Sequence, residues 1–93
     1  MASNLYMICY DLNSPGQDYS ELYDAIKSYG TWWHHLDSTW IVKTSDSAAE
    51  IRDYLGKHLD ANDELLIVRF GDSWAGKGLS KKAYDWLHNN AYK

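Results

Sequence analysis

The side chains with the clearest chemical potential in this sequence are one aspartate, two adjacent histidines and three lysines. Asp11 directly follows the apolar run Leu5–Tyr10, which is typical of a strand in the middle of a sheet. A carboxylate at the end of such a strand is exposed where ligands commonly bind, and its oxygens suit Mg²⁺ or Mn²⁺. The ion would polarise a phosphoryl oxygen and activate water. Asp11 is therefore a candidate catalytic residue and metal ligand; alternatively, it only begins the turn before Pro15.

His34 and His35 are candidate general bases, because either imidazole could lie beside Asp11 or Asp37. The two histidines are adjacent in an expected strand, so their side chains point to opposite faces and cannot both bind one metal ion. The alternative is that both are half-exposed histidines of an aromatic strand, with no role in chemistry.

Lys77, Lys81 and Lys82 belong to the only locally basic stretch, Ser73–Lys82. Lysines in the first turn of a helix that begins near Ser80 oppose the helix dipole, which favours anions there. A bound phosphate group would resolve this conflict, with helix and glycine N–H groups as donors. The P-loop spacing G-x-x-x-x-G-K-[ST] is absent. The alternative is a solvated helix start capped by Ser80.

Four β-prone runs and the helical patterns between them must position these residues. Strands are expected at Leu5–Tyr10, Thr31–Leu36, Thr39–Thr44 and Leu65–Phe70. Apolar residues at helical spacing predict one helix that follows Asp18 as N-cap and ends at Gly30, and a second that follows Ser47. In both, a glutamate three residues after the cap matches a capping box. A short third helix is expected from about Ser80.

The resulting order β-α-β-β-α-β predicts an α+β fold, the ferredoxin-like α/β sandwich, with an antiparallel-mixed four-stranded sheet and both helices on one face. The 93 residues suit a single domain, 1–93, with a core at 5–70 and a C-terminal extension at 71–93. The opposite face of the sheet needs a cover. A second subunit is the simplest candidate, because small domains bury little surface alone, and the C-terminal segment is the competitor.

The net charge and the aromatic content indicate which classes of binding partner the protein favours. A net charge of −4 opposes binding to long nucleic-acid duplexes, which depends on neutralising phosphates. Five Trp and eight Tyr favour a contact surface, since both residue types are enriched at interfaces. Trp32, Trp33, Trp40 and Trp74 could stack on bases or pack in a dimer.

The sequence also bears on the compartment. One cysteine, Cys9, excludes an internal disulfide and is expected to be buried. Neither a signal-peptide pattern nor a membrane-length apolar run is present, so we expect a cytoplasmic protein with no membrane contact.

Several short motifs resemble those of the CRISPR-associated protein two family, the small partner of the spacer-acquisition integrase in antiviral defence. They are the strand closing on Tyr10-Asp11-Leu12, the helix end Tyr29-Gly30, the strand Ser38–Val42 and the run Asp63–Val68. The resemblance covers roughly residues 5 to 70. It implies a ferredoxin-like homodimer formed through the sheet faces. For some members it implies a metal-dependent nuclease whose metal-binding aspartate corresponds to Asp11.

Two functions follow. The first is a homodimeric nucleic-acid-associated protein that binds short RNA or DNA, either without catalysis or as a weak endoribonuclease or endodeoxyribonuclease that uses Asp11 and Mg²⁺ or Mn²⁺. The second is a non-catalytic dimeric module for a small nucleotide or a protein partner, with Lys77, Lys81 or Lys82 on the phosphate. The expected first helix with its cap, Gln17–Tyr29, has three acidic residues and one lysine where the family commonly carries Arg and Lys, and this balance favours a compact ligand over a duplex.

Overall fold

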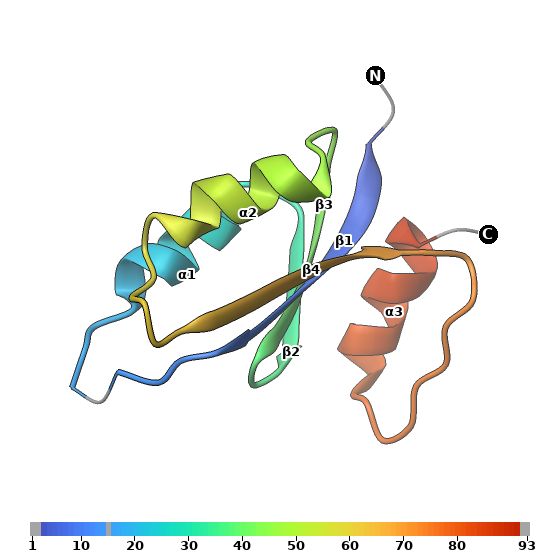
Figure 1. Cartoon of the computed structure of the whole chain (residues 1–93). Coiled ribbons are helices and arrows are strands. Elements are labelled where there is room, and N and C mark those ends of the chain that lie inside the picture. Colours follow the sequence, from blue (N-terminus) through green and yellow to red (C-terminus); the bar gives the residue numbers. More distant parts are fainter. Residues whose placement is uncertain (1–2, 15, 92–93) are drawn as a thin grey trace.

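The computed structural model describes residues 3–14 and 16–91 and has the α+β architecture shown in Figure 1. Within these residues three helices accompany a four-stranded sheet. The elements, in chain order, are β1 (Asn4–Asp11), α1 (Ser20–Lys27), β2 (Trp32–Leu36), β3 (Thr39–Thr44), α2 (Ala48–Gly56), β4 (Glu64–Phe70) and α3 (Lys81–Asn90). No helix in the described part of the chain is long and apolar enough to cross a membrane.

The sheet has the strand order β2-β3-β1-β4, and every pair of neighbours is antiparallel. The mixed pairing that we predicted is therefore absent from the described residues. The reason is that each helical crossover skips a strand: β1 and β2 are separated by β3, and β3 and β4 by β1. The strands that run parallel to each other are thus never adjacent.

Both α1 and α2 pack on one face of the sheet, where the larger core lies (Figure 1). Alternation along β1 points Tyr6, Ile8 and Tyr10 to this side. The largest fully buried side chains all belong to this core: Trp40, Ile8, Leu22, Ile26, Ile51, Leu55 and Val42. Each such side chain contributes about 1.5–3 kcal/mol of hydrophobic stabilisation.

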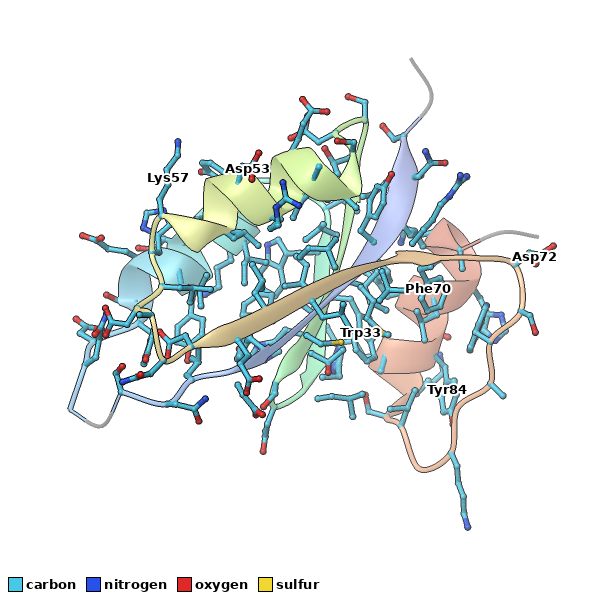
Figure 2. The ribbon with its side chains drawn as sticks, viewed as in Figure 1. Trp33, Asp53, Lys57, Phe70, Asp72 and Tyr84 are labelled. Carbon is cyan, nitrogen blue, oxygen red and sulfur yellow. The ribbon has the colours of Figure 1, made fainter. Side chains whose placement is uncertain are left out.

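The opposite face is partly covered by α3, so the C-terminal segment does much of the covering that we had assigned first to a second subunit. Trp33, Ala83 and Leu87 form the centre of this second core. The Trp33 indole Nε1 donates a hydrogen bond to the Ala83 carbonyl at 3.1 Å, which ties α3 to β2. Figure 2 shows Trp33 and Phe70 in the layer between the sheet and α3.

The cover is incomplete. Leu66 and Val68 of β4 remain 61% and 40% exposed, and Cys9, paired in register with Leu66, is half-buried. We call Cys9, Leu66 and Val68 the open strip. The expectation that Cys9 is buried is wrong, because α3 does not extend over this part of the face.

The caps of the first two helices can be compared with those predicted from the sequence. Ser47 and Glu50 form the predicted capping box: the Glu50 N–H donates to Ser47 Oγ at 3.1 Å, and the Ser47 N–H donates to Glu50 Oε1 at 2.9 Å. For α1 the prediction is wrong by one residue. Asp18 accepts the Ser20 N–H at 2.9 Å in a local turn, and Tyr19 occupies the N-cap position. After α1, Gly30 adopts φ +88°, a left-handed conformation that favours glycine and ends the helical turn.

Candidate functional site

Asp11 lies at the end of β1, directly opposite Glu64, the first residue of β4. Both carboxylates project on the side of the sheet that carries the open strip, because they alternate with Tyr10 and Leu65, which face the larger core. They line an open depression of about 340 Å³ together with Cys9, Tyr10, Leu65 and Leu66. Like charges placed opposite each other in a sheet are destabilising, so a bound cation would relieve this pair.

Glu64 was missed by sequence reasoning. Its alignment with Asp11 depends on the pairing of β1 with β4, which are more than 50 residues apart in the chain, and no local pattern encodes that register. Within residues 3–14 and 16–91, no group of three or more His, Cys, Asp or Glu side chains gathers closely enough to hold a metal ion. One chain therefore presents a pair of carboxylates here, and a bound Mg²⁺ or Mn²⁺ would take its remaining ligands from water, a substrate phosphate or a second copy.

The loop after Asp11 is held in place by Asp63, the first residue of the run Asp63–Val68. Asp63 Oδ1 accepts hydrogen bonds from the Asn13 N–H at 2.8 Å and from the Tyr19 hydroxyl at 2.7 Å. Its Oδ2 accepts the Asp60 N–H at 2.8 Å. Desolvation acts to raise the pKa of Asp63, but these hydrogen bonds outweigh it and hold the pKa below its ordinary value. Asp63 therefore has a structural role beside the candidate site.

The two histidines lie on opposite faces of β2, as strand alternation predicts. His34 stacks on Trp40, with ring centroids 3.8 Å apart, and its Nε2 lies 3.2 Å from the Asp37 carbonyl oxygen. His35 lies 5.0 Å from the Trp33 ring. Neither imidazole makes a described hydrogen bond or ion pair with Asp11. The structure thus brings His34 to the backbone of Asp37 and does not bring either histidine to the candidate metal ligand.

Most of the tryptophans belong to the two cores. Trp40 is 1% exposed, and its Nε1 donates to the Tyr10 hydroxyl at 2.9 Å, while burial raises the pKa of Tyr10. Trp33 is 3% exposed beneath α3. Trp32 is more accessible, at 38%, and carries the Lys27 ammonium 5.5 Å from its ring centroid. A base could therefore stack on Trp32, but Trp33 and Trp40 are occupied by packing.

The basic segment before α3 is partly engaged within the chain. Ser80 Oγ accepts the Ala83 N–H at 3.1 Å and so caps the helix. Lys81 Nζ donates to Asp85 at 2.8 Å, and this hydrogen bond raises the pKa of Lys81. Lys77 and Lys82 are exposed. Of the three lysines that we had assigned to a phosphate, Lys81 already has a carboxylate partner.

Comparison with known proteins adds no assignment: the chain matches no protein-family model, and no solved structure matches it. The resemblance to the CRISPR-associated protein two family therefore stays a prediction from the quoted motifs.

Proposed function

We propose that the chain is a homodimeric binding protein of a nucleic-acid-associated assembly in the cytoplasm, as its resemblance to the CRISPR-associated protein two family implies. The open strip carries this proposal. Leu66 and Val68 leave apolar surface exposed beside Cys9 on a face that α3 covers only in part. Contiguous exposed apolar surface marks an interaction site, and a second copy of a small domain is its simplest partner.

The arrangement of the strands supports the same proposal. In a ferredoxin-like core two strand–helix–strand crossovers interleave in one sheet, with both helices on one face. The chain has this element order over residues 4–70, and the strand order β2-β3-β1-β4 is compatible with it. We therefore propose the ferredoxin-like topology for this core.

The proposed ligand is a short RNA or DNA strand or a small nucleotide. The net charge of −4 disfavours a long duplex, whereas a compact phosphate ligand needs only a few local cations. Lys77 and Lys82 are exposed beside the start of α3 and are the proposed contacts. A protein partner remains the alternative occupant of the module.

Metal-dependent cleavage of phosphodiesters is the second candidate function, and the opposed carboxylates of Asp11 and Glu64 favour it. In this proposal the pair holds Mg²⁺ or Mn²⁺, and the ion supplies charge stabilisation and an activated water. Because one chain contributes only two carboxylates, with water and substrate as the other ligands, we expect weak metal binding and weak cleavage.

The dimer is tested by light scattering coupled to size-exclusion chromatography of the full chain. A monomer across the micromolar range would refute the proposed function.

Ligand binding is tested by fluorescence anisotropy with short labelled RNA and DNA and by thermal shift with nucleotides. Replacing Lys77 and Lys82 by alanine should weaken binding. The control for loss of an exposed lysine elsewhere is Lys57→Ala, since Lys57 lies at the C-terminal end of α2 beside Tyr54.

Nuclease activity is measured on the same RNA and DNA with Mg²⁺ or Mn²⁺. Binding that persists without cleavage supports the module. Cleavage that is lost in Asp11→Asn and Glu64→Gln, while circular dichroism shows both variants folded, would establish the second candidate instead. Cleavage that survives both substitutions would exclude this carboxylate pair as the catalytic site.

A further inference from the structure

The outer side of β4 is unprotected. Within the described residues the sheet ends at β4, and no strand lies beyond it. The strand runs seven residues, and its register with β1 is continuous from Phe70 to Glu64, without a bulge. It contains no proline or lysine, its charged residues, Glu64 and Arg69, lie toward its two ends, and Leu65–Val68 between them are uncharged. Natural sheets usually protect an edge strand with proline, lysine or other charged residues, with β-bulges, or by keeping the strand very short.

The other edge strand, β2, is protected in these ways. It has five residues, and its register with β3 shifts between Trp33 and Leu36. Such an irregularity bends the edge and interrupts a regular ladder. The Lys27 ammonium also lies over Trp32 on this strand. Of the two edges, β4 is therefore the one prepared to accept another strand.

We propose that two copies of the chain pair antiparallel through β4, with the two-fold axis at Ile67, so that their sheets join into one continuous sheet. This inference rests on the proposed homodimer and places its interface at the edge of the sheet, in place of the sheet-face contact that the resemblance to the CRISPR-associated protein two family implies. All seven residues of β4 then have a partner residue. Leu66 lies opposite Val68 of the partner subunit, so the two most exposed side chains of the open strip cover each other.

Other axes fit less well. Residues paired across an antiparallel ladder must project on the same face, so the axis can only move in whole-residue steps along β4. The axis at Ile67 also places Leu65 opposite Arg69 and Glu64 opposite Phe70 of the partner subunit. An axis at Leu66 would pair only residues 64–68 and would leave Arg69 and Phe70 opposite residues outside the partner's β4. An axis at Val68 would leave Glu64 and Leu65 without partners. The axis at Ile67 pairs the whole strand and keeps the apolar pair together.

The helix side of the edge has room for the partner's side chains. A groove of about 380 Å³ runs beside β4 and is lined by Ala48, Ala49, Arg52 and residues 65–67. The two alanines are small, and this leaves space next to the edge where the partner strand would project its own helix-side residues. The groove and the open strip thus flank the same edge on its two sides, and each could receive alternate side chains of an added strand.

The first experiment places a charge in the interface and measures mass by light scattering. Leu66→Lys and Val68→Lys should each convert a dimeric wild type into a monomer. Leu36→Lys is the matched control, because Leu36 is also an exposed leucine, 47% accessible, but lies at the end of β2. It should remain a dimer. Circular dichroism melts verify that each variant is folded.

The second experiment uses the two-fold axis itself. In a Cys9→Ser background, Ile67→Cys places two thiols opposite each other, within reach of a disulfide. Mild oxidation should cross-link this variant, whereas Leu36→Cys should stay uncross-linked. The β4 interface would be refuted, but the homodimer would not, if the wild type, Leu66→Lys and Val68→Lys are all dimers and residue 67 forms no cross-link. A monomeric wild type would refute both.

Discussion

Replacement of Tyr29 by phenylalanine is expected to stabilise the fold. The Tyr29 hydroxyl is buried and has no hydrogen-bond partner among the described residues, although its ring packs edge-on against Tyr54 with centroids 5.8 Å apart. Burying a hydroxyl without a partner costs about 1–3 kcal/mol. Tyr29→Phe keeps the ring and removes that cost, so we expect a gain of about 1 kcal/mol and a rise in melting temperature of about 4–8 °C for a domain of this size.

The same substitution changes the dependence of stability on alkaline pH. Desolvation, followed by the nearby Asp46, Tyr54 and Glu50, raises the pKa of Tyr29 from 10.0 to about 12. The unfolded chain therefore releases this proton at lower pH than the folded chain does. The contribution of the protonated Tyr29 hydroxyl to the free energy of unfolding is therefore fully present below pH 10, and it is lost as the pH rises toward 12. Tyr29→Phe should lose less stability than the wild type over this interval.

Thermal melts followed by circular dichroism at neutral pH and between these two values test both effects. Tyr54→Phe is the matched control, because the Tyr54 hydroxyl lies 3.0 Å from Ser28 Oγ and has a partner to lose. It should be slightly destabilised. If Tyr29→Phe is destabilised at neutral pH, the hydroxyl has a partner and the reasoning is refuted. An unchanged alkaline profile would refute the titration argument alone.

Three further outcomes are expected. Asp63→Asn should lose less stability than the wild type on acidification, because the lowered pKa of Asp63 makes its carboxylate stabilising above pH 3.8, the pKa of an unfolded aspartate, and that contribution disappears as the pH falls. Thermal melts between neutral and acidic pH measure the effect, and a pH dependence identical to that of the wild type contradicts it. Ser47→Ala should lower the free energy of unfolding, measured in urea, by about 1 kcal/mol, because α2 loses its N-cap. An unchanged free energy of unfolding would contradict this role of Ser47. Trp33→Phe should cost about 1–2 kcal/mol and loosen α3, seen as faster amide exchange over Lys81–Asn90; unchanged exchange would contradict the tie to Ala83.

Local signals predicted the elements well. The runs at Leu5–Tyr10 and Leu65–Phe70 are strands because apolar, β-prone residues continue without a helical period. The capping box at Ser47 starts α2 because both of its hydrogen bonds form within three residues. Strand alternation likewise placed His34 and His35 on opposite faces. Each of these features depends on residues that are close together in the chain.

The candidate site was predicted only in part. Asp11 was found because it ends a strand, but Glu64 became its neighbour through the register of β1 with β4. Asp63 was named only as the start of the run Asp63–Val68, and its hydrogen bonds to Asn13 and Tyr19 join segments far apart in sequence. Lys81 looked available for a phosphate until the first turn of α3 brought it to Asp85. The missing information in the first two cases is long-range pairing.

The sequence by itself determined where the strands and helices form, since hydrophobic period, caps and turns act over a few residues. Tertiary structure alone decided which face α3 covers, which carboxylate lies opposite Asp11, and which edge of the sheet stays unprotected. These depend on strand order and register, and those are selected by the burial of whole faces: α3 reaches Trp33 and Ile41, and the open strip on β4 is left over.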